Sequence, residues 1–414
     1  MKTFFDLYEK VLNDEVNGKR VEVRTLEQIG YDRKQIDCLT HPEKYPPVLV
    51  TKTGGCNCKE PKCVAACLFE AIGHDSKGNV RIDAESCVGC EKCIEACDAE
   101  KLAASRDTVA LLESMSKYDR PVYALVAPAA EGQFGDEVTM GKLRTAFKKL
   151  GFTGMVEVAL FADVLTLKEA LEFDKSIQND GDFLLTSCCC PMWISMIRKV
   201  YTRLVPHVPP SVSPMIACGR TVKKIHSDCT TVFVGPCLAK KAEAKEKDLR
   251  GAVDFVLTFS EVKEIFDAAG IEPGKLQDDG REHSSCAGRI YARTGGVSEA
   301  VRRTVERISP EKKIKLKARQ ANGVKECKEL LNDISNGIIT ANFLEGMGCA
   351  GGCVGGPRSL TGRERGTKLV NSYGATAEYD TPAENPYVAD MLRRIGIDTI
   401  AGLTEDSDIF SRKF

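Results

Sequence analysis

The chain has 414 residues, of which 43% are hydrophobic, and its formal net charge at pH 7 is −1. This length and composition allow two or three globular domains with hydrophobic cores. Acidic and basic residues are interspersed, so the charge pattern indicates neither a nucleic-acid partner nor an anionic membrane surface. We find no signal peptide and no run of about 18 apolar residues. The sequence therefore predicts a cytoplasmic protein without a membrane span.

Three regions follow one another along the chain. Residues 1–50 are mixed and polar and end in the proline-bearing stretch HPEKYPPVLV, which predicts an N-terminal arm. Residues 51–105 contain an internal repeat, because CNCKEPKCVAAC is followed by the similar CVGCEKCIEAC. In residues 106–414, short apolar runs alternate with amphipathic segments: VYALVAP precedes MGKLRTAFKKLG, and VEVALF precedes VLTLKEALEFDKSI. This alternation predicts an α/β fold with parallel strands and crossover helices.

The cysteine content points to metal chemistry. The chain has 19 cysteines and no export signal, and cytosolic thiols are kept reduced, so a disulfide framework is not expected. The histidines are isolated, and we expect each to have a structural or surface role. They are His41, His74, His207, His226 and His283.

The cysteine repeat has ferredoxin-like spacing. Its second half is C-x2-C-x2-C-x3-C, in which three thiolates hold one 4Fe-4S cube and the fourth binds the neighbouring cube. The first half departs from this spacing, as C-x-C-x4-C-x3-C, but keeps four cysteines. A pair of zinc knuckles is the alternative, since zinc sites also use C-x2-C pairs. The crossing rule assigns one cluster to Cys56, Cys58, Cys63 and Cys97, and the other to Cys67, Cys87, Cys90 and Cys93.

Three more cysteine motifs lie downstream: TSCCCPMW at 186–193, GPCLAKKAE at 235–243 and EGMGCAGGCVGGP at 345–357. Each follows a strand-like run, and Pro191 and the stretch after Cys237 look like helix starts. Sites in parallel sheets form beyond the carboxyl ends of strands, so these motifs can converge. They would then supply a third cubane from Cys190, Cys237, Cys349 and Cys353. Buried structural cysteines are the alternative, and we expect that role for Cys38, Cys218, Cys229, Cys286 and Cys327.

These three motifs resemble the three signature loops of the FeFe-hydrogenase catalytic domain, in the same order. The resemblance covers roughly residues 50–400, and TGGVSEA at 294–300 resembles a further family segment. It implies a two-cluster α+β ferredoxin-like module over residues 51–105 and a two-lobed parallel-sheet domain over residues 106–414. It also implies a di-iron unit with carbon monoxide, cyanide and dithiolate ligands, joined to the third cubane through Cys353.

The resemblance also implies roles for residues around the di-iron unit. Lys240 would hydrogen-bond a cyanide ligand, Met347 would pack against the unit, and Pro128 and Pro214 would belong to its pocket. Without the resemblance, Lys240 would be a solvated helix-start lysine and Met347 a core residue. A cysteine beside the unit, followed by carboxylates, would carry protons to and from the surface.

If the first loop is aligned on Pro191, that proton-donating cysteine is Cys189. If it is aligned from Thr186, Cys188 becomes the donor and Cys189 the ligand, because relatives commonly have TSCCPGW with one cysteine fewer. The carboxylates that the resemblance places on the proton route are Glu169, Glu172 and Glu243.

The sequence departs from the common FeFe-hydrogenase pattern at further positions. These are Gly235 at the start of the second loop, Pro209 in place of a serine on the proton route, Met215 near the di-iron unit, and GGP at the end of the third loop. They predict a divergent subgroup. The activity implied is reversible reduction of protons to hydrogen gas, with electrons exchanged with ferredoxin or another soluble carrier, after maturation enzymes install the di-iron unit. A regulatory sensor and an electron-transfer scaffold without the di-iron unit stay open as alternatives.

Overall fold

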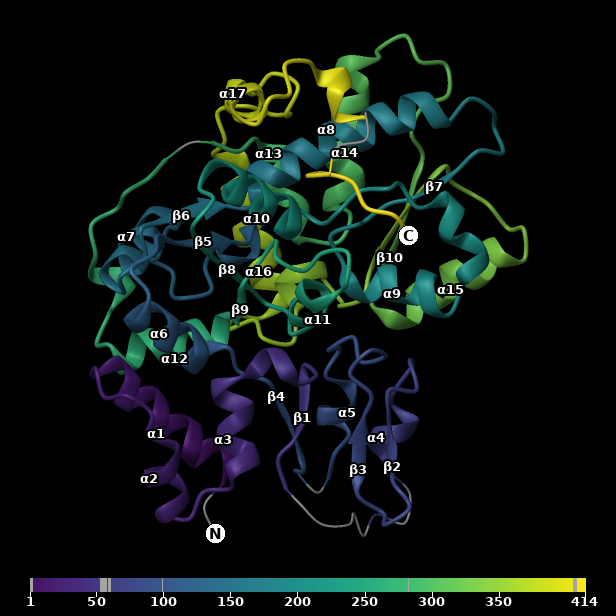
Figure 1. Cartoon of the computed structure of the whole chain (residues 1–414). Coiled ribbons are helices and arrows are strands. Elements are labelled where there is room, and N and C mark those ends of the chain that lie inside the picture. The colour runs from purple at the N-terminus through teal and green to yellow at the C-terminus, as the bar shows by residue number, and fades with distance from the viewer. Residues whose placement is uncertain (1–2, 53–57, 59–60, 99, 282, 405–407) are drawn as a thin grey trace.

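The structure is a computed structural model that describes residues 3–52, 58, 61–98, 100–281, 283–404 and 408–414. Cys56, which was assigned to the first cluster, lies outside the described residues. The chain runs from a small N-terminal part to a larger α/β part (Figure 1). Within the described residues, we find no helix long and apolar enough to cross a membrane.

The N-terminal residues are helical rather than an extended arm. They form α1 (Phe4–Val16), α2 (Val23–Gln28) and α3 (Arg33–Thr40). Thr3 and Asp6 form a reciprocal capping box that starts α1. The apolar face of α1 packs against α6 (Thr108–Lys117) and α12 (Phe259–Ala268). This region therefore shares a hydrophobic core with the larger α/β part.

The two halves of the cysteine repeat have the same order of elements, strand, short helix, strand. The outer strands of the repeat pair antiparallel with each other, and so do the inner ones (Figure 1). We refer to this part, residues 48–104, as the N-terminal cysteine region. Its elements are β1 (Val48–Val50), α4 (Lys62–Ala65), β2 (Ile72–His74), β3 (Val80–Ile82), α5 (Lys92–Glu95) and β4 (Leu102–Ala104).

The rest of the chain contains two parallel sheets, which confirms the predicted α/β class. The four-stranded sheet has the order β6-β5-β8-β9 and the three-stranded sheet the order β10-β11-β7. The strands are β5 (Val122–Val126), β6 (Gly154–Glu157), β7 (Leu184–Leu185), β8 (Thr230–Gly235), β9 (Phe255–Thr258), β10 (Ala318–Asn322) and β11 (Phe343–Met347).

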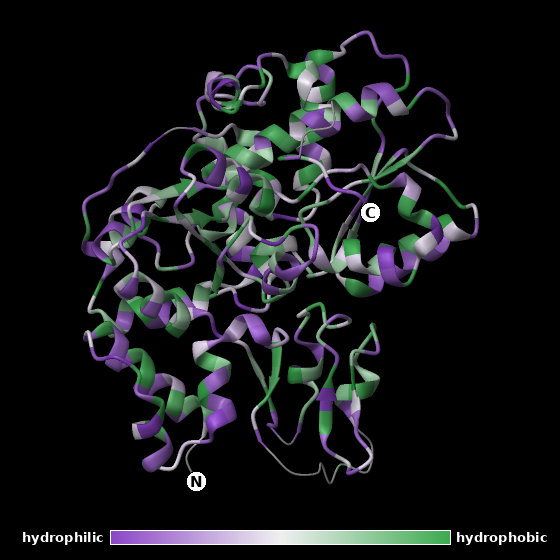
Figure 2. Ribbon diagram, viewed as in Figure 1, coloured by the Kyte–Doolittle hydropathy of each residue, from purple (hydrophilic) through white to green (hydrophobic). Residues whose placement is uncertain are grey.

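Helices cover both sheets, so the strands of the four-stranded sheet are largely apolar (Figure 2). Besides α6 and α12, the α-helices of this part are α7 (Met140–Lys149), α8 (Ala159–Ser176), α9 (Pro191–Lys199), α10 (Pro214–Ile225), α11 (Ala239–Lys245), α13 (Cys286–Arg289), α14 (Gly296–Ile308), α15 (Val324–Ser335), α16 (Arg363–Ala375) and α17 (Pro386–Arg394).

Most expected strand and helix positions are confirmed. The run VYALV is β5, and MGKLRTAFKK is α7, which Thr139 caps. The prediction of one strand through VEVALF is wrong, because β6 ends at Glu157 and ALF already belongs to α8. A short apolar run fits a buried strand and a buried helix start equally well, so periodicity could not separate them.

The three downstream cysteine motifs follow strands, as the sequence predicted. β7 ends just before the first motif, β8 ends at Gly235, the first residue of the second motif, and β11 ends at Met347, two residues before Cys349 of the third motif. Pro191 is the first residue of α9, where its missing N–H costs no hydrogen bond. The carboxyl ends of parallel strands thus deliver all three motifs.

Candidate functional site

The three motifs bring four thiols together. The Cys349 thiol interacts electrostatically with those of Cys190, Cys237 and Cys353. The backbone N–H of Gly348 donates to Cys190 Sγ at 3.3 Å, which ties the first loop to the third. Four converging thiols fit one cubane better than they fit isolated structural cysteines.

The third loop is glycine-rich because its backbone lies very close to other chain segments. Gly352 has φ +81°, and a side chain there would come within 2.6 Å of the Thr294 backbone nitrogen. Thr294 also donates from its backbone N–H to Gly351 O at 3.1 Å. The segment TGGVSEA therefore packs directly against the loop that carries Cys349 and Cys353.

Beside the four thiols lies an almost wholly apolar cavity. Cys353, Cys189 and Lys240 all contribute to its wall, although they come from three different motifs. Met347 is buried in the same hydrophobic cluster as Cys189, but the described lining of the cavity does not include it. The remaining lining residues are Ala127, Pro128, Ala129, Val158, Ala162, Pro214, Met215, Phe233, Tyr291 and Ala292.

Lys240 is a buried cation at the wall of this cavity. Its Nζ donates to Glu243 Oε2 at 2.7 Å, and both side chains are less than a tenth exposed. Burial works against the charged form, but the Glu243 carboxylate outweighs it, so the pKa of Lys240 is raised. A fixed ammonium beside a thiol-lined apolar cavity can hold an anionic ligand there.

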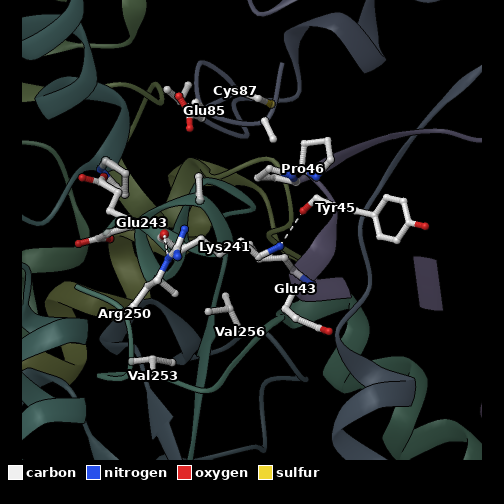
Figure 3. Close-up of a pocket in the computed structure, with 18 of the residues that line it drawn as sticks. Glu43, Tyr45, Pro46, Glu85, Cys87, Lys241, Glu243, Arg250, Val253 and Val256 are labelled. Carbon is white, nitrogen blue, oxygen red and sulfur yellow. Dashed lines mark hydrogen bonds between the residues drawn. The ribbon is translucent and has the colours of Figure 1, made fainter. Parts of the chain in front are cut away.

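The other end of this ion pair faces a cleft. The cleft measures about 1000 Å³ and separates the N-terminal cysteine region from α9 and α11. Figure 3 shows Glu243 at its wall with Lys241 and Arg250, and Cys87 on the opposite side. Glu243 thus links the apolar cavity, through Lys240, to an open cleft.

The first loop places its three cysteines in different surroundings. Cys190 is one of the four converging thiols, and Cys189 lines the apolar cavity. The Cys188 thiol donates to Glu169 Oε1 at 3.4 Å. Thr186 also donates to Glu169, through its hydroxyl, and its carbonyl accepts from the Trp193 indole at 2.7 Å. The three consecutive thiols therefore extend from the group of four converging thiols to the Glu169 carboxylate.

Sequence reasoning missed two polar residues near Glu172. Lys168 is 1% exposed, and its Nζ contacts Glu172 Oε1 and donates to Ser211 Oγ at 2.9 Å. Ser211 lies two residues after Pro209, where the resemblance led us to expect a serine on the proton route. The i,i+4 spacing of Lys168 and Glu172 on a predicted helix was the available signal for the ion pair. The signal gave no indication that the pair is buried.

Glu169 gives a prediction for the pH dependence of stability. Burial raises its pKa to about 7 from the ordinary value of 4.5, although the Thr186 and Cys188 hydrogen bonds oppose the rise. The folded state therefore holds the proton more tightly than the unfolded state, and stability falls as the pH rises from about 4.5 to 7. Between pH 5 and pH 8 the protein should lose about 2.5 kcal/mol relative to Glu169→Gln. Anaerobic unfolding of both proteins at several pH values measures this loss, and parallel curves would contradict it.

In the N-terminal cysteine region, four of the assigned ligands line one small pocket. They are the four thiols that the crossing rule assigned to one cluster: Cys67, Cys87, Cys90 and Cys93. Of the other set, Cys63 is buried, Cys97 is half-buried in the same hydrophobic cluster, and Cys58 is exposed. Among the described residues, no three Cys, His, Asp or Glu side chains converge closely enough to hold a single metal ion.

The five cysteines expected to be structural are spread through the protein. Cys218 and Cys327 are fully buried, and Cys38 and Cys229 are also buried. Cys286 is half-buried, and Arg303 donates to its sulfur at 3.6 Å.

Comparison with known proteins identifies the family. A model described as "Iron only hydrogenase large subunit, C-terminal domain" matches residues 120–357, which is more than half of the chain. The chain belongs to this family. Membership in an iron-sulfur family also supports cluster binding by the converging cysteines.

Individual relatives have different printed functions. Iron hydrogenase 1 of Clostridium pasteurianum is 29% identical over 306 residues, which cover 60% of this chain. The match spans only 53% of that enzyme, so the chain corresponds to about half the length of this relative. Cytosolic iron-sulfur assembly component 3 of Pongo abelii is 23% identical over 349 residues, or 71% of this chain and 72% of that protein. Family membership alone therefore does not define the activity.

Solved structures show the same fold. An apo form of the [FeFe]-hydrogenase HydA1 from Chlamydomonas reinhardtii matches with a TM-score of 0.59 at 19% identity. The match covers 73% of this chain and 98% of that structure. The parallel-sheet domain is therefore an FeFe-hydrogenase catalytic fold.

Proposed function

We propose that the protein is an FeFe-hydrogenase of a divergent subgroup that interconverts protons, electrons and hydrogen gas. One observation carries the proposal: an apolar cavity beside four converging thiols is lined by Cys353, Cys189 and the Lys240 side chain. Cys353 belongs both to the four thiols and to the cavity wall. A di-iron unit joined to a cubane through one thiolate fits this arrangement.

The cysteines would hold three 4Fe-4S clusters. Two would lie in a ferredoxin-like module formed by residues 51–105, after a helical N-terminal part formed by residues 1–50. The third would lie in the catalytic domain of residues 106–414, bound by the four thiols of the signature loops. The di-iron unit, when bound, supplies the metal chemistry by which protons and electrons combine to hydrogen. The protein supplies the anchors, the dry cavity and the proton route.

In this proposal Cys189 is the proton donor at the cavity wall. Cys188 and Glu169 continue the route, since they are joined by the 3.4 Å hydrogen bond, and Glu172 completes it next to Lys168. The Glu172 side chain is 14% exposed and Glu169 is 1% exposed, so Glu172 is the end of the route nearer to solvent. Lys240 would hold a cyanide ligand while Glu243 balances its charge, and Met347, Pro128 and Pro214 would shape the pocket.

A second candidate is an iron-sulfur protein that carries cubanes without the di-iron unit. The similarity to an iron-sulfur assembly component favours it. Lys240 at the wall of the apolar cavity argues against it, because a protein that only carries cubanes has no use for a cation at that place. A regulatory sensor remains a third reading of the same site. Under the leading proposal the partners are ferredoxin or another soluble carrier, and maturation enzymes, in the cytoplasm.

An infrared spectrum of anaerobically matured protein tests the proposal, together with iron content and a hydrogen-production assay. We expect carbonyl and cyanide bands with turnover. The same bands with negligible turnover would favour a sensor, and about twelve irons without such bands, four for each of three cubanes, would indicate a scaffold. Lys240→Met is the informative variant, because it should shift or remove the cyanide bands while the cubane iron is retained.

A further inference from the structure

The segment 85–93 carries three thiols of the small N-terminal pocket. It contacts the helix that follows the first signature loop of the catalytic domain, the second loop itself, and the residue that directly follows the third loop. The first contact comes from α9, which follows the first loop. Lys199 Nζ donates to the backbone carbonyls of Glu85 and Ser86 at 2.8 and 3.2 Å. These carbonyls directly precede Cys87, so α9 holds the start of the segment.

The second contact is a close backbone approach to the second loop. Gly89 has φ +69°, and a side chain there would lie 3.0 to 3.1 Å from backbone atoms of Leu238 and Ala239. These residues follow Cys237 immediately. Only glycine allows this conformation and this distance without strain. The chain between Cys87 and Cys90 is therefore pressed against the loop that carries Cys237.

The third contact is an ion pair with the residue that directly follows the third loop. Arg358 Nε donates to Glu91 Oε1 at 3.0 Å, and its Nη2 pairs with the other carboxylate oxygen. The Glu91 side chain is 5% exposed and the Arg358 side chain 23%. Bidentate pairing of a guanidinium with a carboxylate fixes both distance and orientation.

Glu91 has an unusual backbone conformation that points to a specific role. Its φ is +64°, in the left-handed region that side-chain-bearing residues seldom adopt. Such a conformation persists only where its surroundings over-determine it. Arg358 also donates from its backbone N–H to Pro236 O at 3.0 Å, so the same residue is tied to the second loop.

From these contacts we infer that the Glu91–Arg358 ion pair is a positioning device that fixes the second N-terminal cluster beside the catalytic cubane and so sets electron transfer between them. The neighbouring Lys92 interacts electrostatically with Cys349, which supports the close approach of the two ligand sets. In the step concerned, one electron leaves the reduced N-terminal cluster and reduces the oxidised cubane. The electron comes from a soluble carrier of the ferredoxin class.

The inference rests on the proposed cubanes but not on the di-iron unit. It is therefore tested on full-length protein that holds the cubanes alone. Electrons are delivered by reduced ferredoxin, and the reduction of the catalytic cubane is followed in time. In Glu91→Gln and Arg358→Gln we expect this reduction to be at least about tenfold slower, because loss of one partner of a buried charge pair weakens such a contact by at least that factor. Reduction by a small diffusible reductant should be unchanged.

The matched control is Arg319→Gln, which breaks the ion pair with Asp333 at the outer sheet, where both side chains are about one-third exposed. It should leave the electron-transfer rate unchanged. Arg358→Lys should recover only part of the rate, because a lysine keeps the charge but not the bidentate geometry. If both glutamine variants keep normal iron content and a normal rate, the inference is wrong. Absence of the di-iron bands in mature protein would instead overturn only the proposed activity.

Discussion

Replacing Cys189 by Ala is expected to lower hydrogen production by about 10²–10⁴-fold, the usual contribution of a positioned proton-transfer group. Cys189 lines the apolar cavity, where it is buried together with Lys240, and Cys353 contributes to the same wall. Alanine keeps the packing but has no transferable proton. Turnover of anaerobically matured protein, with infrared bands and iron content as checks of assembly, measures the effect.

Cys188→Ala and Cys218→Ala are the comparison variants. The first removes the hydrogen bond to Glu169 and should slow turnover less than Cys189→Ala. The second removes a core thiol that is 0% exposed and is not among the residues that line the cavity, so turnover should change little. If Cys188→Ala abolished turnover while Cys189 proved dispensable, the alignment of the first loop on Pro191 would be wrong.

Replacing Lys241 by Met is expected to lower the free energy of unfolding by about 3–5 kcal/mol, the cost of breaking a buried ion pair from one side. Lys241 Nζ donates to Asp107 and to Glu261 at 2.9 Å each, and its side chain is 0% exposed. Methionine fills a similar volume but leaves two carboxylates buried without their cation. These ion pairs join three helices, because Asp107 precedes α6, Lys241 lies on α11 and Glu261 caps α12. Their loss should therefore weaken the packing of all three helices.

Anaerobic thermal unfolding with clusters intact measures this loss. Lys263→Met is the control, since Lys263 pairs with Asp267 on the same helix as Glu261 but both side chains are more than half exposed. Exposed pairs contribute about 0.2–1 kcal/mol, so the control should unfold close to the parent protein. Equal destabilisation by the two variants would contradict the stabilising role assigned to the buried ion pairs of Lys241 with Asp107 and Glu261.

The parallel sheets could be predicted because buried strands leave a strong local pattern. β5 and β8 are continuous apolar runs followed by turn residues, and their neighbours show the same sequence of strand and helix. The N-terminal helices were not predicted, although α1 buries Phe4, Leu7, Tyr8, Val11 and Leu12 at helical spacing and packs on α6 and α12. Tertiary contacts of this kind decide short helices more than propensity does.

The candidate ligands could be predicted from their position after strands, but the directions of the three first-loop thiols could not. Ser187, which precedes them, has φ +72° and is fully buried. A left-handed residue at that point redirects the next side chains, and nothing in TSCCCPMW indicates that conformation. The buried states of Lys168 and Lys240 also depend on long-range packing, so composition alone made both look like surface residues.

The ion pair between Lys240 and Glu243 affects the electrostatic field in the apolar cavity. Glu243 borders the cleft that separates the N-terminal cysteine region from α11, and Lys240 borders the inner cavity. Because the Glu243 carboxylate offsets part of the Lys240 charge, the field in the cavity depends on how strongly water in the cleft screens that carboxylate. The field in the cavity is thereby coupled to how tightly the N-terminal cysteine region sits on the domain. Widening of the cleft would therefore change the electrostatic potential in the apolar cavity.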